Sequence, residues 1–204
     1  MSNLNSTHKK YSYACERNKD VILDTLVSYF PKNCYVLELA SGTGQHADYF
    51  TSKQSGWVWQ ATDVDSETTE SILAYQKEAK RDNFLIPRKL STVDKAWDLG
   101  QFDAALCCNM IHISPWKSCL GLFLHLEKHL KQGSYFALYG PFIQSGVTTA
   151  LSNISFDKSL KQRDPTWGIR NLDDVKEVAK KHSFELFKVN EMAANNLTVV
   201  FEKS

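Results

Sequence analysis

The hydrophobic positions of this chain repeat with two different periods, and the two periods alternate along the sequence. Residues 16–30 carry apolar side chains at helical spacing up to Pro31, whereas residues 35–40 form the short apolar run typical of a buried strand. The alternation continues to the C-terminus. We predict helices over 16–30, 45–50, 66–80, 114–130 and 172–182, and strands over 35–40, 57–62, 84–90, 102–109, 134–139, 184–189 and 196–201.

Strands and helices in this order indicate an α/β fold with a mostly parallel sheet, because each crossover helix covers one face of the sheet. The 204 residues contain no internal repeat, and we expect a single domain over 1–204 with a flexible N-terminus over 1–15. In the helix over 114–130, Ser114 is the expected N-cap, Pro115 suits the first turn, and Gly133 is placed to end it. Leu120 and Leu124 are assigned to its apolar face.

Residues 141–170 lose this periodicity and collect glycine, proline, asparagine and aromatic side chains. A stretch of this length is too long for an idle connection in a small domain. We therefore predict a lid over the substrate.

The charge balance limits the classes of function. With 24 Lys and Arg against 23 Asp and Glu, the net charge of +1 argues against a general nucleic-acid binder. No apolar run reaches the roughly 20 residues of a membrane span, and the N-terminus lacks the apolar core of a signal peptide. We expect a cytoplasmic protein, or a nuclear one, whose five cysteines are small hydrophobic residues rather than disulfides.

A metal site is not expected. His125 and His129 lie one helical turn apart, and Cys119 lies on the same helix. Cys119 is too far along the helix from the two histidines to complete a set of metal ligands with them. Cys107 and Cys108 are adjacent on a strand and point to opposite faces.

The strongest chemical signal is the glycine loop between residues 38 and 46, which follows the first strand and precedes a helix. Open α/β sheets bind their ligands at this end of the strands. Gly42, Gly44 and Ala47 also match the dinucleotide-binding pattern, so an NAD-dependent oxidoreductase is one alternative.

Two carboxylates favour a different cofactor. Glu38 would repel a pyrophosphate, whereas S-adenosylmethionine has no phosphate and carries an ammonium and a sulfonium cation. Asp63 follows Gly44 by nineteen residues at the end of the second strand, where it can accept both ribose hydroxyls of either cofactor. Glu38 therefore makes the distinction, and it favours the methyl donor.

Eight sequence blocks extend this interpretation across almost the whole chain. In order they are ERN (16–18), VLELASGTGQH (36–46), WQATDVD (59–65), NMIHISPW (109–116), YGPF (139–142), FDKSL (156–160), DPTWGIR (164–170) and MAANNL (192–197). From about residue 13 to residue 203 the chain resembles the methyltransferase-like protein 26 family, which are class I S-adenosylmethionine-dependent methyltransferases.

The resemblance implies a Rossmann-like, seven-stranded sheet with an antiparallel last strand. It also implies donor contacts from Glu38, Ser41, Gly42, Gly44, His46 and Asp63. Where the family usually has Leu-Asp-Val after the third strand, this chain has Leu90-Ser91-Thr92, so Ser91 is expected to make a weaker contact to adenine. Arg17 opens the first helix and either orders the donor pocket or pairs with a surface carboxylate.

Asn109, His112 and Tyr139 follow the fourth and fifth strands, where class I enzymes bring donor and acceptor together. Asn109 is assigned to the donor site. His112 is either a positioning group or base for the acceptor, or it bonds a loop carbonyl. Tyr139 either hydrogen-bonds the acceptor or caps the sheet.

Arg163 and Arg170 flank Trp167 in the predicted lid, and guanidinium groups bind carboxylates bidentately, which indicates an anionic substrate. Alternatively, Arg170 ties the lid to the body and Arg163 is exposed to solvent. Trp116 and Asn195 are assigned to the substrate pocket, with core packing and an ordinary turn as their alternatives.

Together these features predict an S-adenosylmethionine-dependent methyltransferase that transfers a methyl group in line to a small-molecule acceptor. The alternative outside enzymology is a catalytically silent binding protein with the same fold. The Asn-Pro-Pro-Tyr motif of amino-directed nucleic-acid methyltransferases is absent. Residues 35–70 carry six acids and one lysine, for a net −5, whereas the predicted lid carries a net +2, which suits a cationic cofactor beside an anionic or neutral acceptor.

Overall fold

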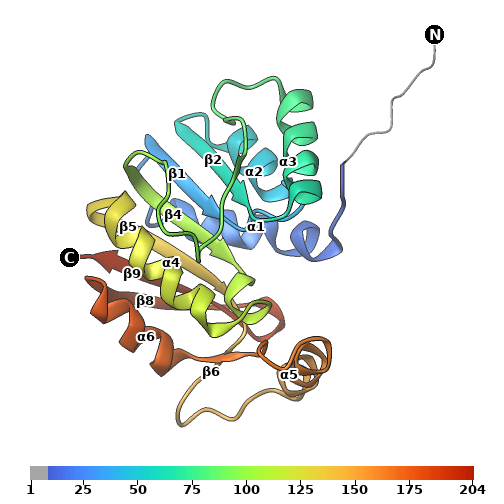
Figure 1. Cartoon of the computed structure of the whole chain (residues 1–204), viewed down its shortest axis with the longest axis vertical. Coiled ribbons are helices and arrows are strands. Elements are labelled where there is room, and N and C mark those ends of the chain that lie inside the picture. The colour runs from blue at the N-terminus through green and yellow to red at the C-terminus, as the bar shows by residue number, and fades with distance from the viewer. Residues whose placement is uncertain (1–8) are drawn as a thin grey trace.

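Seven strands form the central sheet of the computed structural model, which describes residues 9–204 (Figure 1). The strand order is β3-β2-β1-β4-β5-β9-β8, in which β9 runs antiparallel to β5 and β8 and the other neighbours are parallel. The bounds are Cys34–Leu39 for β1, Trp57–Asp63 for β2, Arg88–Lys89 for β3, Phe102–Cys108 for β4, Leu130–Gly140 for β5, Phe184–Met192 for β8 and Asn196–Lys203 for β9. The predicted mostly parallel, seven-stranded sheet with a reversed final strand is confirmed.

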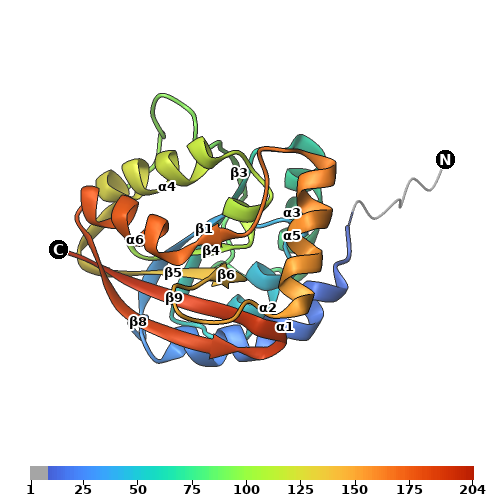
Figure 2. The same cartoon turned by 90° about the horizontal axis from the view of Figure 1, so that it is seen from below.

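Helices cover both faces of this sheet (Figures 1 and 2). One face packs against α1 (Tyr13–Val27), α2 (Gln45–Lys53) and α3 (Ser66–Ala79), and the other packs against α4 (Trp116–His129) and α6 (Leu172–Lys181). Each layer has its own apolar core, with Phe50 fully buried in the first and Phe123 in the second. The central parallel strands β1, β2 and β4 are therefore buried along most of their length, as parallel strands covered on both faces require. None of the helices between residues 9 and 204 has the length and apolarity needed to cross a membrane.

The segment that leads into α1 is structured from residue 9. The Lys10 amide donates to Ser71 Oγ at 2.8 Å, the Tyr75 hydroxyl donates to the Lys10 carbonyl at 3.2 Å, and Ser12 caps the helix at Cys15. The prediction of a flexible segment is thus wrong for residues 9–15, because contacts with α3 hold them. The rest of that segment, residues 1–8, lies outside the described residues.

The start and end of α4 differ from the prediction. Pro115, not Ser114, is the N-cap, and Ser114 Oγ instead donates to the Met110 carbonyl at 2.8 Å. Leu130 leaves the helix and is buried as the first residue of β5, so Gly133, with φ of 76°, lies inside that strand. Apolar residues continue from the end of α4 into the start of β5, so the sequence pattern does not mark where the helix ends and the strand begins.

The apolar face of α4 is also rotated from the predicted one. Leu120 and Leu124 are exposed, whereas Cys119 and Leu122 are buried against the sheet together with Phe123.

The predicted lid contains α5 (Leu151–Arg163), a helix that the pattern did not reveal (Figure 2). Only Asn153 and Leu160 of this helix are buried, and Leu151 is 82% exposed. Without an apolar stripe, a helix leaves no periodic signal in the sequence. The short strands β6 (Phe142–Ile143) and β7 (Arg170–Asn171) pair with each other and join the two ends of this segment.

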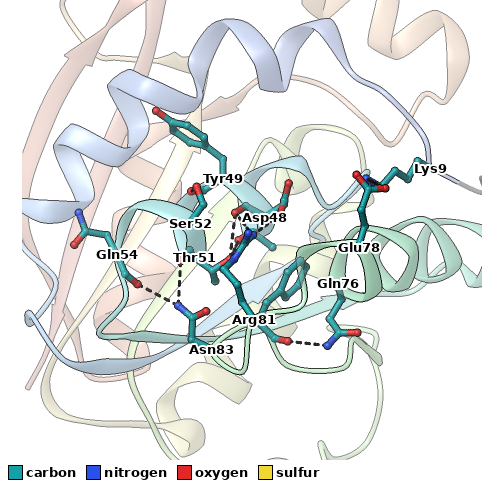
Figure 3. A network of polar contacts seen from close by, with 12 residues as sticks. Lys9, Asp48, Tyr49, Thr51, Ser52, Gln54, Gln76, Glu78, Arg81 and Asn83 are labelled. Carbon is teal, nitrogen blue, oxygen red and sulfur yellow. Dashed lines mark hydrogen bonds and ion pairs between the residues drawn. The ribbon is translucent and has the colours of Figure 1, made fainter.

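A polar network fixes α2, the helix that the glycine loop opens, to the segment between α3 and β3 (Figure 3). Arg81 donates to the Asp48 carbonyl at 2.7 Å and pairs with the Asp48 carboxylate. The side-chain Nδ2 of Asn83 donates to the carbonyls of Thr51 at 3.1 Å and Gln54 at 3.3 Å. The network holds α2 from Asp48 to its C-terminal end, so the glycine loop leads into a fixed helix.

Candidate active site

The glycine loop adopts backbone angles that glycine tolerates best. Gly42 has φ of 60° and Gly44 has φ of 93°. A Cβ on Gly44 would lie 2.9 Å from Ile72 Cα, so this glycine permits close packing of the loop on α3. A Cβ on Gly42 would meet no atom within 4 Å, so the backbone at Gly42 faces open space that a ligand can enter.

Asp63 and Ser41 join the loop to the end of β2. The Gly42 amide donates to Asp63 Oδ2 at 3.0 Å, and the Asp65 amide donates to Oδ1 at 3.1 Å. Ser41 Oγ accepts from the Thr62 amide at 3.1 Å. Burial raises the pKa of Asp63, while the backbone amides of Asp65 and Gly42 oppose that rise. Each carboxylate oxygen retains lone pairs for a further donor, such as a ribose hydroxyl.

Glu38 lies beneath the loop and is 1% exposed. Its Oε2 accepts from Trp59 Nε1 at 2.9 Å, and burial raises its pKa to about 7. His46 Nδ1 lies 4.0 Å from Glu38 Oε1, and burial lowers the pKa of His46 to about 4. His46 is therefore neutral at pH 7 and does not neutralise the carboxylate, which leaves Glu38 able to favour a bound cation.

Ser91 follows β3, the strand that pairs with the end of β2. The Leu90 amide donates to the Asp63 carbonyl at 2.9 Å, so Ser91 continues directly from the edge of β2. Trp97 Nε1 donates to the Ser91 carbonyl at 2.8 Å, and Ser91 Oγ accepts from the Val93 amide at 3.3 Å. The hydroxyl can still donate one hydrogen bond.

A cavity of about 840 Å³ opens at the carboxyl end of the sheet, between α1, the ends of β4 and β5, and α5. It is bounded by a mixture of apolar and amide side chains. The lining residues are Ala14, Arg17, Asn18, Val21, Asn109, Ile113, Tyr139, Pro141, Ser152, Asn153, Phe156, Ala193, Ala194, Asn195 and Asn196.

Four residues predicted from the sequence lie together in this cavity: Arg17, Asn109, Tyr139 and Asn195. Asn109 has φ of 61°, an unusual angle for a residue other than glycine, at the end of β4. Burial raises the pKa of the Tyr139 hydroxyl, against the opposing effects of Asn18 and Arg17. Tyr139 is therefore a protonated hydrogen-bonding group at neutral pH.

His112, the predicted base, does not line the cavity. Its side chain is fully buried, its Nδ1 accepts from the Arg170 amide at 3.3 Å, and its carbonyl accepts from the Gly168 amide at 2.9 Å. Burial lowers the pKa of His112 to about 3. His112 thus anchors residues 168–170 to the end of β4. This is close to the alternative role expected from the sequence, except that the ring bonds a loop amide and not a loop carbonyl.

Arg170 uses three side-chain donors on backbone carbonyls. Its Nε donates to the Ile111 carbonyl at 2.8 Å, and its Nη2 donates to the carbonyls of Ser114 at 2.6 Å and Thr166 at 2.9 Å. Its guanidinium lies over the Trp116 ring, 5.6 Å from the centroid, and Trp116 packs against the core. The contacts of Arg170 match the alternative in which it ties the predicted lid to the body, and neither Arg170 nor Trp116 is among the residues that line the cavity.

Arg163 and Trp167 contact each other, with the guanidinium 5.5 Å from the ring centroid, and neither lines the cavity. The structure separates them from Asn195, with which they were predicted to bind substrate. Their contact lies at the end of α5, where Asp164 ends the helix.

The histidines of α4 bond backbone carbonyls. His125 Nε2 lies 2.9 Å from the Asp94 carbonyl and His129 Nδ1 lies 3.0 Å from the Gly100 carbonyl, with Trp97 stacked on both rings. Across residues 9–204, no three His, Cys, Asp or Glu side chains are arranged to hold a metal ion.

The sequence did not identify three further members of the cavity wall. Asn18 lines the cavity and accepts a 2.8 Å hydrogen bond from His46 Nε2, and its only signal was its place in the block ERN. Asn153 and Phe156 come from α5. Asn153 Nδ2 donates to the Asn195 carbonyl at 3.0 Å, which joins α5 to the loop before β9.

Comparison with known proteins agrees with this architecture. A family model described as "Protein of unknown function (DUF938)" matches residues 9–203. Among solved structures, human N-acetylserotonin methyltransferase in complex with S-adenosylmethionine aligns with a TM-score of 0.75 and 15% identity, over 94% of this chain and 53% of that one. An O-methyltransferase family protein from Burkholderia thailandensis aligns with a TM-score of 0.76 and 13% identity, over 94% and 57%.

A third structure, provisionally assigned as a sarcosine dimethylglycine methyltransferase from Galdieria sulphuraria, aligns with a TM-score of 0.73 and 13% identity, over 97% of this chain and 92% of that one. The chain spans about half the length of the first two proteins. At these identities the likeness shows the fold, which is the Rossmann-like class I methyltransferase fold. The resemblance to the methyltransferase-like protein 26 family stays a prediction.

Proposed function

The chain belongs to the DUF938 family, and from that premise we propose that it is an S-adenosylmethionine-dependent methyltransferase acting on a small-molecule acceptor. One observation carries the proposal: the backbone at Gly42 faces open space, with the carboxylates of Glu38 and Asp63 at the ends of the adjacent strands β1 and β2. Two acids at an uncovered glycine loop suit a cofactor that carries positive charge and no phosphate.

The residues present fit this cofactor. Asp63 would accept the ribose hydroxyls, Gly42 would allow its backbone to approach the ligand, and Ser91 would lie toward the adenine. Glu38 would stabilise the cationic end, since its neighbour His46 is neutral. Residues 38–46 contain no lysine or arginine, so this loop would offer a dinucleotide pyrophosphate no side-chain cation.

Helix α1 connects the proposed donor site with the cavity. Asn18 lines the cavity and bonds His46 at the start of α2, and Cys15 Sγ lies 4.0 Å from Thr43 Oγ1 in the glycine loop. When bound, S-adenosylmethionine supplies a methyl group already activated on a sulfonium sulfur. The task left to the protein is to hold the acceptor in line with that group and to exclude water, for which the cavity beside the loop is suited.

The cavity offers no evident base. Among the described residues that line it there is no Asp, Glu, His, Lys or Cys, and the raised pKa of Tyr139 keeps that hydroxyl protonated. The proposed reaction therefore relies on positioning, and the acceptor atom must reach its unprotonated, nucleophilic form without help from a titrating side chain.

Transfer of a labelled methyl group from S-adenosylmethionine to fractions of a metabolite extract tests this function. We expect label in a small-molecule fraction with the wild-type protein and strongly reduced label with Asp63→Asn, which keeps the shape of the side chain but removes its charge. Donor binding without transfer to any fraction would instead support the catalytically silent alternative, and would contradict the proposed activity.

A further inference from the structure

Among the described residues, 9–204, that line the 840 Å³ cavity, Arg17 is the only charged one. Its side chain is exposed on α1, and within residues 9–204 it forms no ion pair and no hydrogen bond to another side chain or to a backbone carbonyl. An arginine that lines a cavity without a partner has all of its side-chain donors available to a ligand.

The acids nearest to Arg17 on α1 are engaged elsewhere. Glu16 pairs with Lys19, and Asp20 accepts a hydrogen bond from the Tyr49 hydroxyl. Tyr139, whose pKa reflects the charge of Arg17, is the closest titrating group that shares the cavity wall. Neither of these acids forms an ion pair with Arg17.

The remaining wall is apolar or uncharged. Val21, Ile113 and Phe156 supply apolar surface, and asparagine side chains supply amides. The side-chain Nδ2 of Asn195 donates to Ser152 Oγ at 3.1 Å, so this part of the wall is held in place. A ligand that matches the wall has an apolar body, and a single anionic group that meets Arg17.

We propose that the acceptor is a small amphipathic carboxylate whose carboxylate is bound by Arg17; this inference rests on the proposed methyltransferase function. A planar guanidinium binds a carboxylate through two parallel hydrogen bonds. A single negative charge also suits the site better than a phosphate dianion, because one arginine would leave part of the dianion unpaired beside the acidic donor half, residues 35–70 with a net −5.

This assignment moves anion recognition from the predicted lid to α1. Arg170 donates three hydrogen bonds to backbone carbonyls, and Arg163 stacks on Trp167. Neither residue is among those that line the cavity, so neither competes with Arg17 for the anion there.

The first test measures binding without turnover. Matched pairs of acid and carboxamide, phenylacetate with phenylacetamide and indole-3-acetate with indole-3-acetamide, are titrated into the full chain in the presence of S-adenosylhomocysteine, with binding followed by ligand-observed NMR. We expect the acids to bind about tenfold more tightly than the amides. Arg17→Ala should remove that preference and Arg17→Lys should retain part of it. The matched control Lys158→Ala, which removes one positive charge from α5 outside the cavity lining, should preserve it.

Equal binding of acid and amide by the wild-type protein, no binding of either up to the solubility limit, or an unchanged preference in Arg17→Ala would overturn the inference. The methyl-transfer assay separates its failure from that of the proposed function. Label that enters a neutral, unretained fraction from an anion exchanger, equally in wild type and Arg17→Ala, would leave the methyltransferase intact and refute the carboxylate. Label in the retained fraction that is lost in Arg17→Ala would support both.

Discussion

Replacing Glu38 by glutamine gives a sharp prediction, because this carboxyl group is buried with a strongly displaced pKa. In the folded protein its pKa is about 7, against 4.5 for an ordinary glutamate. Between these two pH values the folded protein keeps the proton and the unfolded chain releases it. The folded state therefore binds more protons in that window, and the free energy of unfolding falls as the pH rises.

The displacement from 4.5 to about 7 corresponds to about 3 kcal/mol of stability lost across that window. Glutamine keeps the acceptor for Trp59 Nε1 and cannot ionise. We thus expect Glu38→Gln to match the wild type near pH 4.5 and to exceed its stability by about 3 kcal/mol above pH 7. His46, with its pKa lowered to about 4, titrates in both proteins, so its effect cancels in the difference.

Urea denaturation of both proteins between pH 4.5 and 8 measures this difference, with Glu185→Gln, which changes an exposed glutamate on β8, as the control that should follow the wild type. The same Glu38→Gln protein should bind S-adenosylmethionine more weakly at pH 8, because the cation loses a buried negative charge. A stability difference that does not change with pH would refute the argument that burial of Glu38 opposes its ionisation.

Three further predictions concern the loop and the predicted lid. Gly42→Ala should cost about 1 kcal/mol of stability through backbone strain, yet abolish calorimetric binding of the donor. Gly44→Ala should destabilise the fold more, because its Cβ would lie 2.9 Å from Ile72 Cα. Equal losses of stability in the two variants would contradict the open space at Gly42. Arg170→Ala removes three hydrogen bonds to carbonyls and should lower stability by about 2 kcal/mol and speed proteolysis within residues 141–170, while donor affinity stays unchanged in calorimetry. His112→Gln should leave the pH dependence of methyl transfer between pH 5 and 8 unchanged, because the pKa of His112 is about 3; the loss of an inflection near neutral pH would restore His112 as a base.

The order of strands and helices was predictable because each buried strand is a short apolar run bounded by polar or glycine residues. Residues 34–39 and 102–108 are of this kind, and both strands lie at the centre of the sheet. The glycine loop was predictable for the same reason, since Gly42 and Gly44 follow the first run directly. Helix α5 was not, because its buried side chains do not form a stripe.

The roles of individual side chains were less accessible from the sequence. Arg170 and His112 have backbone partners more than fifty residues away, and no pattern of residue types specifies a carbonyl or an amide at that distance. The charge of Arg170 suggested an anion, but its donors are used within the fold. Arg17 shows the opposite case. The sequence offered a surface ion pair as one alternative, whereas the structure places Arg17 at a cavity, with no ion pair to any residue between 9 and 204.

The assignment of α1 to the cavity depends on packing that local sequence does not encode. Asn18 reaches His46 only because α1 lies across the start of α2, and the contacts of Lys10 with α3 precede that helix. Such long-range contacts can be identified only from the three-dimensional structure. The glycine loop, in contrast, can be identified from the sequence, because a strand, two glycines and an acid are enough to mark it.

The proposed binding site for S-adenosylmethionine is the loop at Gly42 together with Glu38 and Asp63. Calorimetric titration of the wild-type protein with S-adenosylmethionine, S-adenosylhomocysteine and NAD tests it most directly. We expect saturable binding of the first two and no binding of NAD. Binding of NAD alone, or no binding of either adenosyl compound, would contradict it.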